Sequence, residues 1–174
     1  MAGYSGTPLP QKLGIKDGHR VALVGAPTGF TRTLGRLPAG ATTQNGLGGK
    51  DVLDVVVVFV TDRTDLLDQV AAARPRMAQA GGLWIAWPKK SSGVATDVTE
   101  NVIRDVALPT GLVDNKVCAI DDTWSGLRLV IRVENRTVEN PAAKKSKPAS
   151  KSLFFSKLRS SRFCRTGARA RRAT

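Results

Sequence analysis

One apolar run, VLDVVVVFV at residues 52–60, constrains the fold of this chain more than any other feature. Most of its residues are β-branched, and such residues favour a β-strand. Because apolar residues occupy both alternating sets of positions, the predicted strand is buried on both faces, as in a parallel sheet covered by helices on either side. Its uninterrupted apolar part, Val55 to Val60, is about a third of a membrane span, so the sequence predicts no transmembrane helix.

Further strands are predicted on both sides of this run. They lie at residues 20–26, 41–45, 83–88, 116–120 and 127–133. The segment 41–45 has the weakest pattern, whereas the first and third are apolar runs bounded by Gly or Pro. In the last segment apolar residues alternate with Arg128 and Arg132, so the final two strands, joined by DDTWSG, are expected to form an antiparallel hairpin.

Three helices are predicted between the strands. The first is a short helix within residues 28–37. The second follows Asp62, a suitable N-cap residue, and its buried stripe consists of Leu66, Val70, Ala73 and Met77. Pro75 predicts a break or kink in that helix, and Gly81 and Gly82 are expected to end it.

The third helix has a predicted start and a predicted end. Asp97 lies three residues before Glu100, which is the spacing of a capping box. The expected buried face consists of Val98, Val102, Ile103 and Val106. Pro109 and Gly111 are expected to end this helix.

Strands that alternate with helices predict an α/β fold, because each right-handed crossover places its helix on a face of a parallel sheet. We expect a small Rossmann-like domain at residues 19–135, with a mostly parallel sheet and a C-terminal antiparallel hairpin. Residues 1–18, rich in Gly and Pro, are expected to form an extended N-terminal arm. Residues 136–174 are expected to form a disordered basic tail.

The tail carries most of the excess charge. The whole chain has a net charge of +13, and residues 141–174 hold 11 of its 27 basic residues and none of its 14 acidic ones. The rest of the chain has a net charge of +2, so only the tail is expected to contact polyanions. The residues expected to make such contacts are Lys144, Lys145, Lys147, Arg159, Arg162, Arg165, Arg169, Arg171 and Arg172.

Residues with catalytic or metal-binding chemistry are few. With one histidine, His19, and two cysteines, Cys118 and Cys164, no zinc site of the usual ligand count and no disulfide framework is expected. No Ser/His/Asp set or carboxylate pair stands at a recognisable spacing, so no catalytic residue is predicted. The start MAGYSGTPLP lacks the pattern of a signal peptide, and a cytoplasmic location is expected.

Two glycine-rich segments are candidate nucleotide sites. In Gly25-Ala26-Pro27-Thr28-Gly29, Pro27 offers no N–H, and the following candidate strand ATTQN lacks the acidic residue that holds a ribose. The segment GLGGK at 46–50 precedes a strand and is followed by Asp51, so it is expected to be a flexible connection and not a phosphate loop. No cofactor is predicted.

The carboxyl ends of parallel strands share one edge of a sheet, where ligands of such folds usually bind. If the first hairpin strand runs parallel to the others, its turn faces the WPKKSS loop at that edge. The residues expected to share a cleft are Thr28, Asp62, Lys89, Lys90, Ser91, Ser92, Asp121, Asp122 and Trp124. Lysines and hydroxyls suit a small anion. The alternative is that the lysines are solvated and pair with Asp62 or Asp121, while Trp87 and Trp124 belong to the core.

Four segments resemble a bacterial family known as domain of unknown function 3052, over roughly residues 2–133. They are AGYSGTPLPQKLGIKDGHRVAL, FVTDR, LWIAWPKKSSGVATDVTE and GLVDNKVCAIDDTWSGLRLV. More loosely, the chain resembles a shortened class I methyltransferase. LDVVVVFV is similar to the fourth strand of that fold, MAQAGGLWIAW to its glycine turn and fifth strand, and KVCAIDD with LRLVIRV to its closing hairpin. Neither resemblance implies a particular activity.

Three functional hypotheses follow. The first is a non-catalytic cytoplasmic domain that binds a small anionic ligand or a protein partner at the carboxyl edge of the sheet. The second is a divergent adenosylmethionine-dependent methyltransferase. The third is a nucleic-acid-associated protein that acts through its basic tail.

Overall fold

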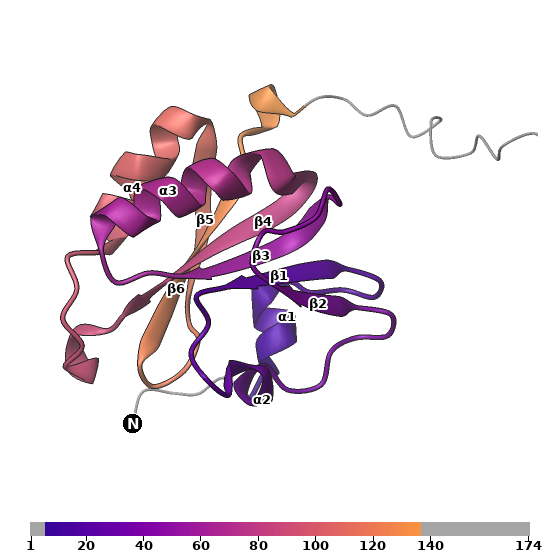
Figure 1. Ribbon diagram of the computed structural model, residues 1–174, viewed down its shortest axis with the longest axis horizontal. Helices are drawn as coiled ribbons and strands as arrows, with labels where there is room; N and C mark the ends of the chain where they lie inside the picture. Colours follow the sequence, from indigo (N-terminus) through magenta and orange to yellow (C-terminus); the bar gives the residue numbers. More distant parts are fainter. Residues whose placement is uncertain (1–5, 137–174) are drawn as a thin grey trace, which may run out of the picture. The chain divides into compact units, whose positions relative to one another are not determined.

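The computed structural model describes residues 6–136. The chain divides into two compact units, residues 1–138 and 139–174. The second unit lies outside the described residues, as does the predicted tail apart from Arg136. The first unit contains a six-stranded sheet with the strand order β2-β1-β3-β4-β6-β5, shown in Figure 1. The α/β fold class predicted from the sequence is confirmed.

Five of the six strands point the same way. The parallel strands are β1 (Arg20–Val24), β2 (Thr42–Asn45), β3 (Leu53–Phe59) and β4 (Met77–Pro88). The strand β6 (Trp124–Ile131) runs antiparallel to both β4 and β5 (Leu112–Ala119). As a result β5 runs parallel to the first four strands, and the turn between β5 and β6 lies at their carboxyl edge.

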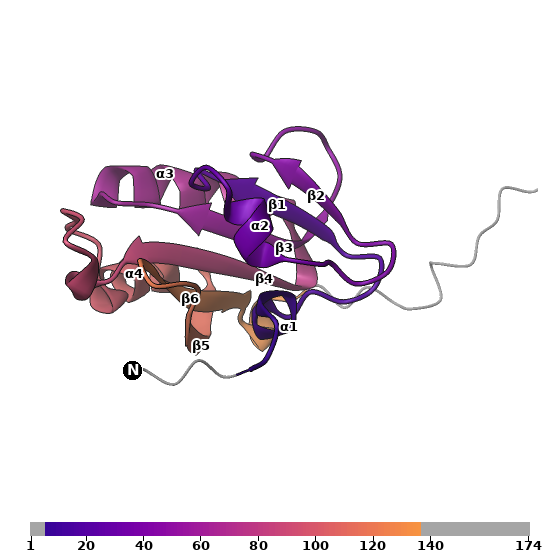
Figure 2. The same ribbon diagram turned by 90° about the horizontal axis from the view of Figure 1, so that it is seen from below.

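Two layers of helices cover the sheet. Helices α3 (Arg63–Ala73) and α4 (Glu100–Ala107) lie on one face, and α1 (Leu9–Leu13) and α2 (Phe30–Leu34) lie on the other, as Figures 1 and 2 show. Each face has its own apolar cluster, so the strand β3 is buried on both sides as its sequence predicts. No helix in residues 6–136 is long and apolar enough to cross a membrane.

The prediction of an extended arm at residues 1–18 is wrong for residues 9–15. Residues 9–13 form α1, which ends where Gly14 adopts a left-handed conformation with φ of +75°. Leu13 and Ile15 are buried against the sheet. The buried indole N–H of Trp84 donates to the carbonyl oxygen of Leu13 at 2.9 Å. This apolar packing explains why a segment rich in Gly and Pro is not a free arm.

The boundary between α3 and β4 also differs from the prediction. Helix α3 ends at Ala73, a 3₁₀ turn follows at residues 74–76, and Met77 already belongs to β4 instead of the helical stripe. Pro75 explains this break, because proline cannot continue the helical hydrogen bonds. Gly81 and Gly82 lie within the strand, where a Cβ on Gly81 would come within 2.8 Å of the Asp54 carbonyl oxygen.

Two further boundaries are corrected. The N-cap of α4 is Thr99, whose hydroxyl accepts from the Val102 N–H at 3.4 Å, and not Asp97. The hairpin strands are longer and begin earlier than predicted, at Leu112 and Trp124. The polar residues at 114–116, which form an irregular, bulged part of β5, obscure its start in the sequence. The strand β6 begins inside the DDTWSG segment that was expected to join the two strands.

Candidate functional site

The loop after β4 and the turn between β5 and β6 lie together at the carboxyl edge of the sheet, as the topology predicts. Pro88 pairs with Trp124 across the two antiparallel strands. One residue later, the backbone N–H of Lys89 donates to the Thr123 carbonyl oxygen at 2.8 Å. These contacts bring two segments more than thirty residues apart into one local structure.

The two adjacent lysines of this loop have different surroundings. The half-buried Lys89 side chain donates through its ammonium to the Asp121 carbonyl oxygen at 2.6 Å, and so ties the loop to the turn. Lys90 is exposed, and its ammonium has no hydrogen-bond or ion-pair partner within residues 6–136. Of the two, only Lys90 offers an unused positive charge to a ligand.

Several other predicted site residues hold the local backbone in place. The Asp121 carboxylate accepts from the N–H groups of Thr123 and Trp124, both at 2.8 Å. The Ser92 hydroxyl donates to the Lys89 carbonyl oxygen at 2.6 Å. Asp62 is the N-cap of α3, where its carboxylate accepts from the Asp65 N–H at 2.8 Å. These side chains already have structural hydrogen bonds.

A cavity of about 480 Å³ lies where the end of β4 meets the start of α4. It is lined by Trp87, Pro88, Lys90, Thr96, Val98, Thr99, Glu100, Asn101 and Arg104. Its volume falls within the usual range of small-molecule sites. Apart from Lys90, none of these residues was among the predicted site residues.

Arg104 forms the charged wall of this cavity. Its guanidinium pairs with Asp114 at 3.0 Å and with Glu100, and it also donates to Asn101 at 3.4 Å. The hydrogen bond to Asp114 raises the pKa of Arg104 above its usual value, and Glu100 adds to this shift, while desolvation opposes it. The guanidinium therefore stays charged, and the two carboxylates more than balance its positive charge.

The predicted single cleft is divided into separate places. A second cavity, of about 510 Å³, lies beside α1, α2 and the β5–β6 turn, and it contains Asp121 and Asp122 in its wall. Lys90 lies in the wall of the first cavity instead. Trp124 is half-buried in the apolar cluster of the α1–α2 face, where its ring meets Phe59 edge-on at a centroid distance of 5.1 Å.

The remaining predicted site residues, Thr28 and Ser91, are exposed and line neither of these two cavities. Thr28 lies in the turn after β1. In that turn Gly25 has a φ of +63°, and a Cβ there would lie 2.9 Å from the Phe59 carbonyl oxygen. The glycine is thus explained by its close approach to β3, without any ligand.

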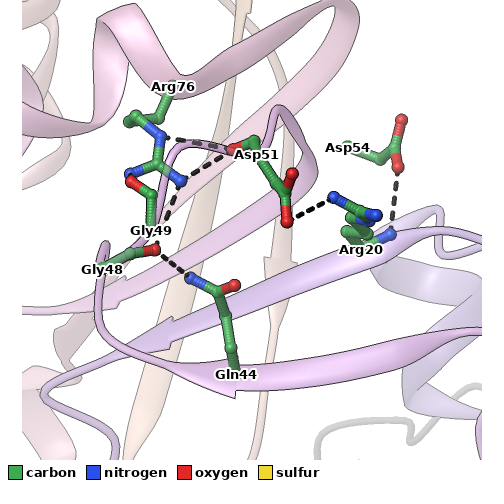
Figure 3. A network of polar contacts seen from close by, with 7 residues as sticks. All are labelled: Arg20, Gln44, Gly48, Gly49, Asp51, Asp54 and Arg76. Carbon is green, nitrogen blue, oxygen red and sulfur yellow. Dashed lines mark hydrogen bonds and ion pairs between the residues drawn. The ribbon is translucent and has the colours of Figure 1, made fainter.

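The GLGGK loop is ordered by side chains, which corrects the prediction of a flexible connection. The guanidinium of Arg76 donates to the carbonyl oxygens of three loop residues and of the residue that follows the loop, as Figure 3 shows for part of the set. These residues are Leu47, Gly48, Gly49 and Asp51. The amide of Gln44 donates to Gly48 at 3.0 Å. Carbonyl oxygens turned toward a cation are opposite in polarity to the N–H groups of a phosphate loop.

Figure 3 also shows how the same region is joined to the start of the sheet. The Asp51 carboxylate pairs with the Arg20 guanidinium at 2.7 Å, and Asp54 accepts from the Arg20 N–H at 3.0 Å. This polar network lies away from the carboxyl edge, since Arg20 is the first residue of β1. These polar side chains therefore join the start of β1 to the segment that precedes β3 and to β3 itself.

The described part of the chain gives little support to a metal site or to a nucleophilic cysteine. Residues 6–136 contain no group of three His, Cys, Asp or Glu side chains placed to hold a metal ion. Cys118 is half-buried, and burial raises the pKa of its thiol even though Lys116 and Lys12 lower it. A protonated thiol of this kind is a poor nucleophile.

Comparisons with known proteins place the chain in a family and in a fold. A family model described as "Protein of unknown function (DUF3052)" matches residues 41–133, which is more than half of the chain. No curated protein matches the sequence.

Solved structures with a similar fold include two methyltransferases. A SAM-dependent methyltransferase from Aquifex aeolicus is 12% identical, with a TM-score of 0.53 over 70% of this chain and 87% of that chain. A ribosomal protein L11 methylase from Lactobacillus delbrueckii subsp. bulgaricus is 13% identical, with a TM-score of 0.52 over 71% of this chain and 75% of that chain. At such low identity the likeness shows a shared Rossmann-like fold alone.

Proposed function

The chain belongs to the DUF3052 family, and we propose that its domain binds a small anionic ligand, without catalysing a reaction, in the cavity between β4 and α4. The observation that carries this proposal is the unpartnered ammonium of Lys90 in the cavity wall. A charge-assisted hydrogen bond to such a group is about twice as strong as a neutral one. Lys90 is also the only one of the two loop lysines that the described fold leaves available.

The walls of the cavity support this assignment. Trp87 and Pro88 offer apolar surface, while Lys90 and the side-chain amide of Asn101 offer polar groups. Small-molecule sites typically combine a mostly apolar wall with a few polar groups that fix the orientation of the ligand. A cytoplasmic location and a polyanion contact through the basic tail remain parts of this proposal.

The test uses the two neighbouring lysines as a matched pair. Thermal unfolding is measured for the wild type, Lys90→Ala and Lys89→Ala, with and without acetate, benzoate, succinate or inorganic phosphate. A ligand at 100 times its Kd adds about 2.7 kcal/mol to stability, which is a readily measured increase in Tm. We expect at least one of the organic anions to raise the Tm of the wild type and of Lys89→Ala, and none to raise that of Lys90→Ala.

Two results would overturn the proposal. If no anion raises the Tm of the wild type, or if Lys90→Ala responds like the wild type, the cavity is not an anion site. Adenosylmethionine is included in the same screen, because a response to it that survives Lys90→Ala would favour the methyltransferase alternative. In that case the ligand site would be expected at the turn after β1.

A further inference from the structure

Trp87 has three properties that bear on which kind of anion this cavity takes. Its side chain packs against the apolar cluster of the α3–α4 face, is half-buried, and lines the same cavity as Lys90. Its indole N–H has no hydrogen-bond partner within residues 6–136. By contrast, Trp84 is fully buried and its N–H is bound to the Leu13 carbonyl oxygen. Trp87 therefore lines the cavity with an aromatic side chain whose N–H donor is unpartnered in the described part of the chain.

We propose that the ligand is an aromatic monocarboxylate, with its ring against the Trp87 indole and its carboxylate on the Lys90 ammonium. This inference rests on the proposed function and names the class of molecule that the same cavity takes. Aromatic rings attract one another in offset or edge-on arrangements, in addition to the surface that they bury. Pro88 also lines the cavity.

The charges of the cavity favour a single negative charge on the ligand. Lys90 supplies one positive charge without a partner, whereas the charge of Arg104 is neutralised by Glu100 and Asp114. Glu100 itself lines the cavity. A second negative charge on the ligand would face this carboxylate without a positive partner. Like charges in such surroundings repel, so a dianionic phosphate is disfavoured.

The test compares probes that differ only in the proposed features. Benzoate has the ring and one charge, acetate has the charge alone, benzamide has the ring alone, and phenyl phosphate has the ring with a second charge. Calorimetry on the full chain is expected to give a Kd for benzoate about tenfold lower than for each of the other three. A tenfold ratio corresponds to about 1.4 kcal/mol.

Variants of Trp87 then assign the preference to this side chain. In Trp87→Leu the Kd values for benzoate and acetate are expected to become equal within about twofold, while Trp87→Phe keeps most of the preference. Trp124→Phe is the matched control, because its ring lies on the opposite face of the sheet. Equal benzoate preference in wild type and Trp87→Leu would overturn the inference.

Tryptophan fluorescence gives a second readout that does not depend on a stable Leu variant. Benzoate is expected to change the emission of the wild type and of Trp124→Phe, and to leave that of Trp87→Phe unchanged. A change that persists in Trp87→Phe would contradict the proposed stacking.

The two proposals fail in different ways. If benzoate and acetate bind with equal affinity and both need Lys90, the anion site stands and the aromatic preference is wrong. If none of the probes binds, the proposed function is wrong, and the aromatic preference is wrong with it.

Discussion

Two polar loops of this domain use similar side chains to different ends. In the Arg76 loop, residues 46–51, the guanidinium of Arg76 and the amide of Gln44 are directed at backbone carbonyl oxygens of the loop. In the Lys90 loop, residues 89–92, Lys89 and Ser92 hold the backbone in the same way, but Lys90 remains exposed. A basic side chain beside small residues is thus either part of the fold or available to a ligand, and its three-dimensional neighbours decide which.

The largest expected effect comes from breaking the Arg76 loop. Arg76→Ala removes hydrogen bonds from one charged group to four carbonyl oxygens, and bonds to charged groups contribute about 1.5–3 kcal/mol. We expect the free energy of unfolding to fall by about 3 kcal/mol in urea denaturation. Arg63→Ala is the control, because this exposed arginine has no partner within residues 6–136. Equal losses in the two variants would show that the loop does not depend on Arg76.

A smaller effect is expected where only one such bond is lost. Lys89→Ala removes the hydrogen bond to the Asp121 carbonyl oxygen, and we expect the free energy of unfolding to fall by about 1.5 kcal/mol. Lys90→Ala is expected to change it by less than about 0.5 kcal/mol, as is usual for surface substitutions. Equal stability of Lys89→Ala and Lys90→Ala would contradict the different roles assigned to the two lysines.

The smallest of the three effects concerns Asp62, which was predicted both as an N-cap and as a cleft residue. Its carboxylate caps α3 and lies in the wall of neither cavity. Asp62→Ala is expected to lower the free energy of unfolding by about 1 kcal/mol. Asp62→Asn keeps an oxygen that accepts from the Asp65 N–H and serves as the matched control. A loss of anion binding in Asp62→Asn would instead show that Asp62 contributes to the anion site.

The central part of the fold is predictable from sequence because burial leaves a regular pattern of apolar residues. The strand at residues 52–60 and the buried face of α4 are of this kind. The first half of β4 is not, since Met77 continues the helical spacing of the preceding residues and only Pro75 marks the change. The local sequence pattern here is compatible with both a helix and a strand. Pairing with β3 favours the strand.

The candidate site is predictable to the level of the sheet edge and no further. Topology places Lys89 and Lys90 at the carboxyl ends of the strands, but their different roles depend on the Asp121 carbonyl oxygen, 32 residues away. The wall formed by α4 depends on how that helix packs. One readable signal was available, because Glu100 and Arg104 stand at the i,i+4 spacing of a helical ion pair.

A crystal structure of the wild-type protein soaked with benzoate tests the central claim most directly. The account predicts electron density for benzoate in the cavity between β4 and α4, with its carboxylate within hydrogen-bonding distance of Lys90 Nζ and its ring against the Trp87 indole. Density at the turn after β1, or a cavity that stays empty at saturating benzoate, would contradict it.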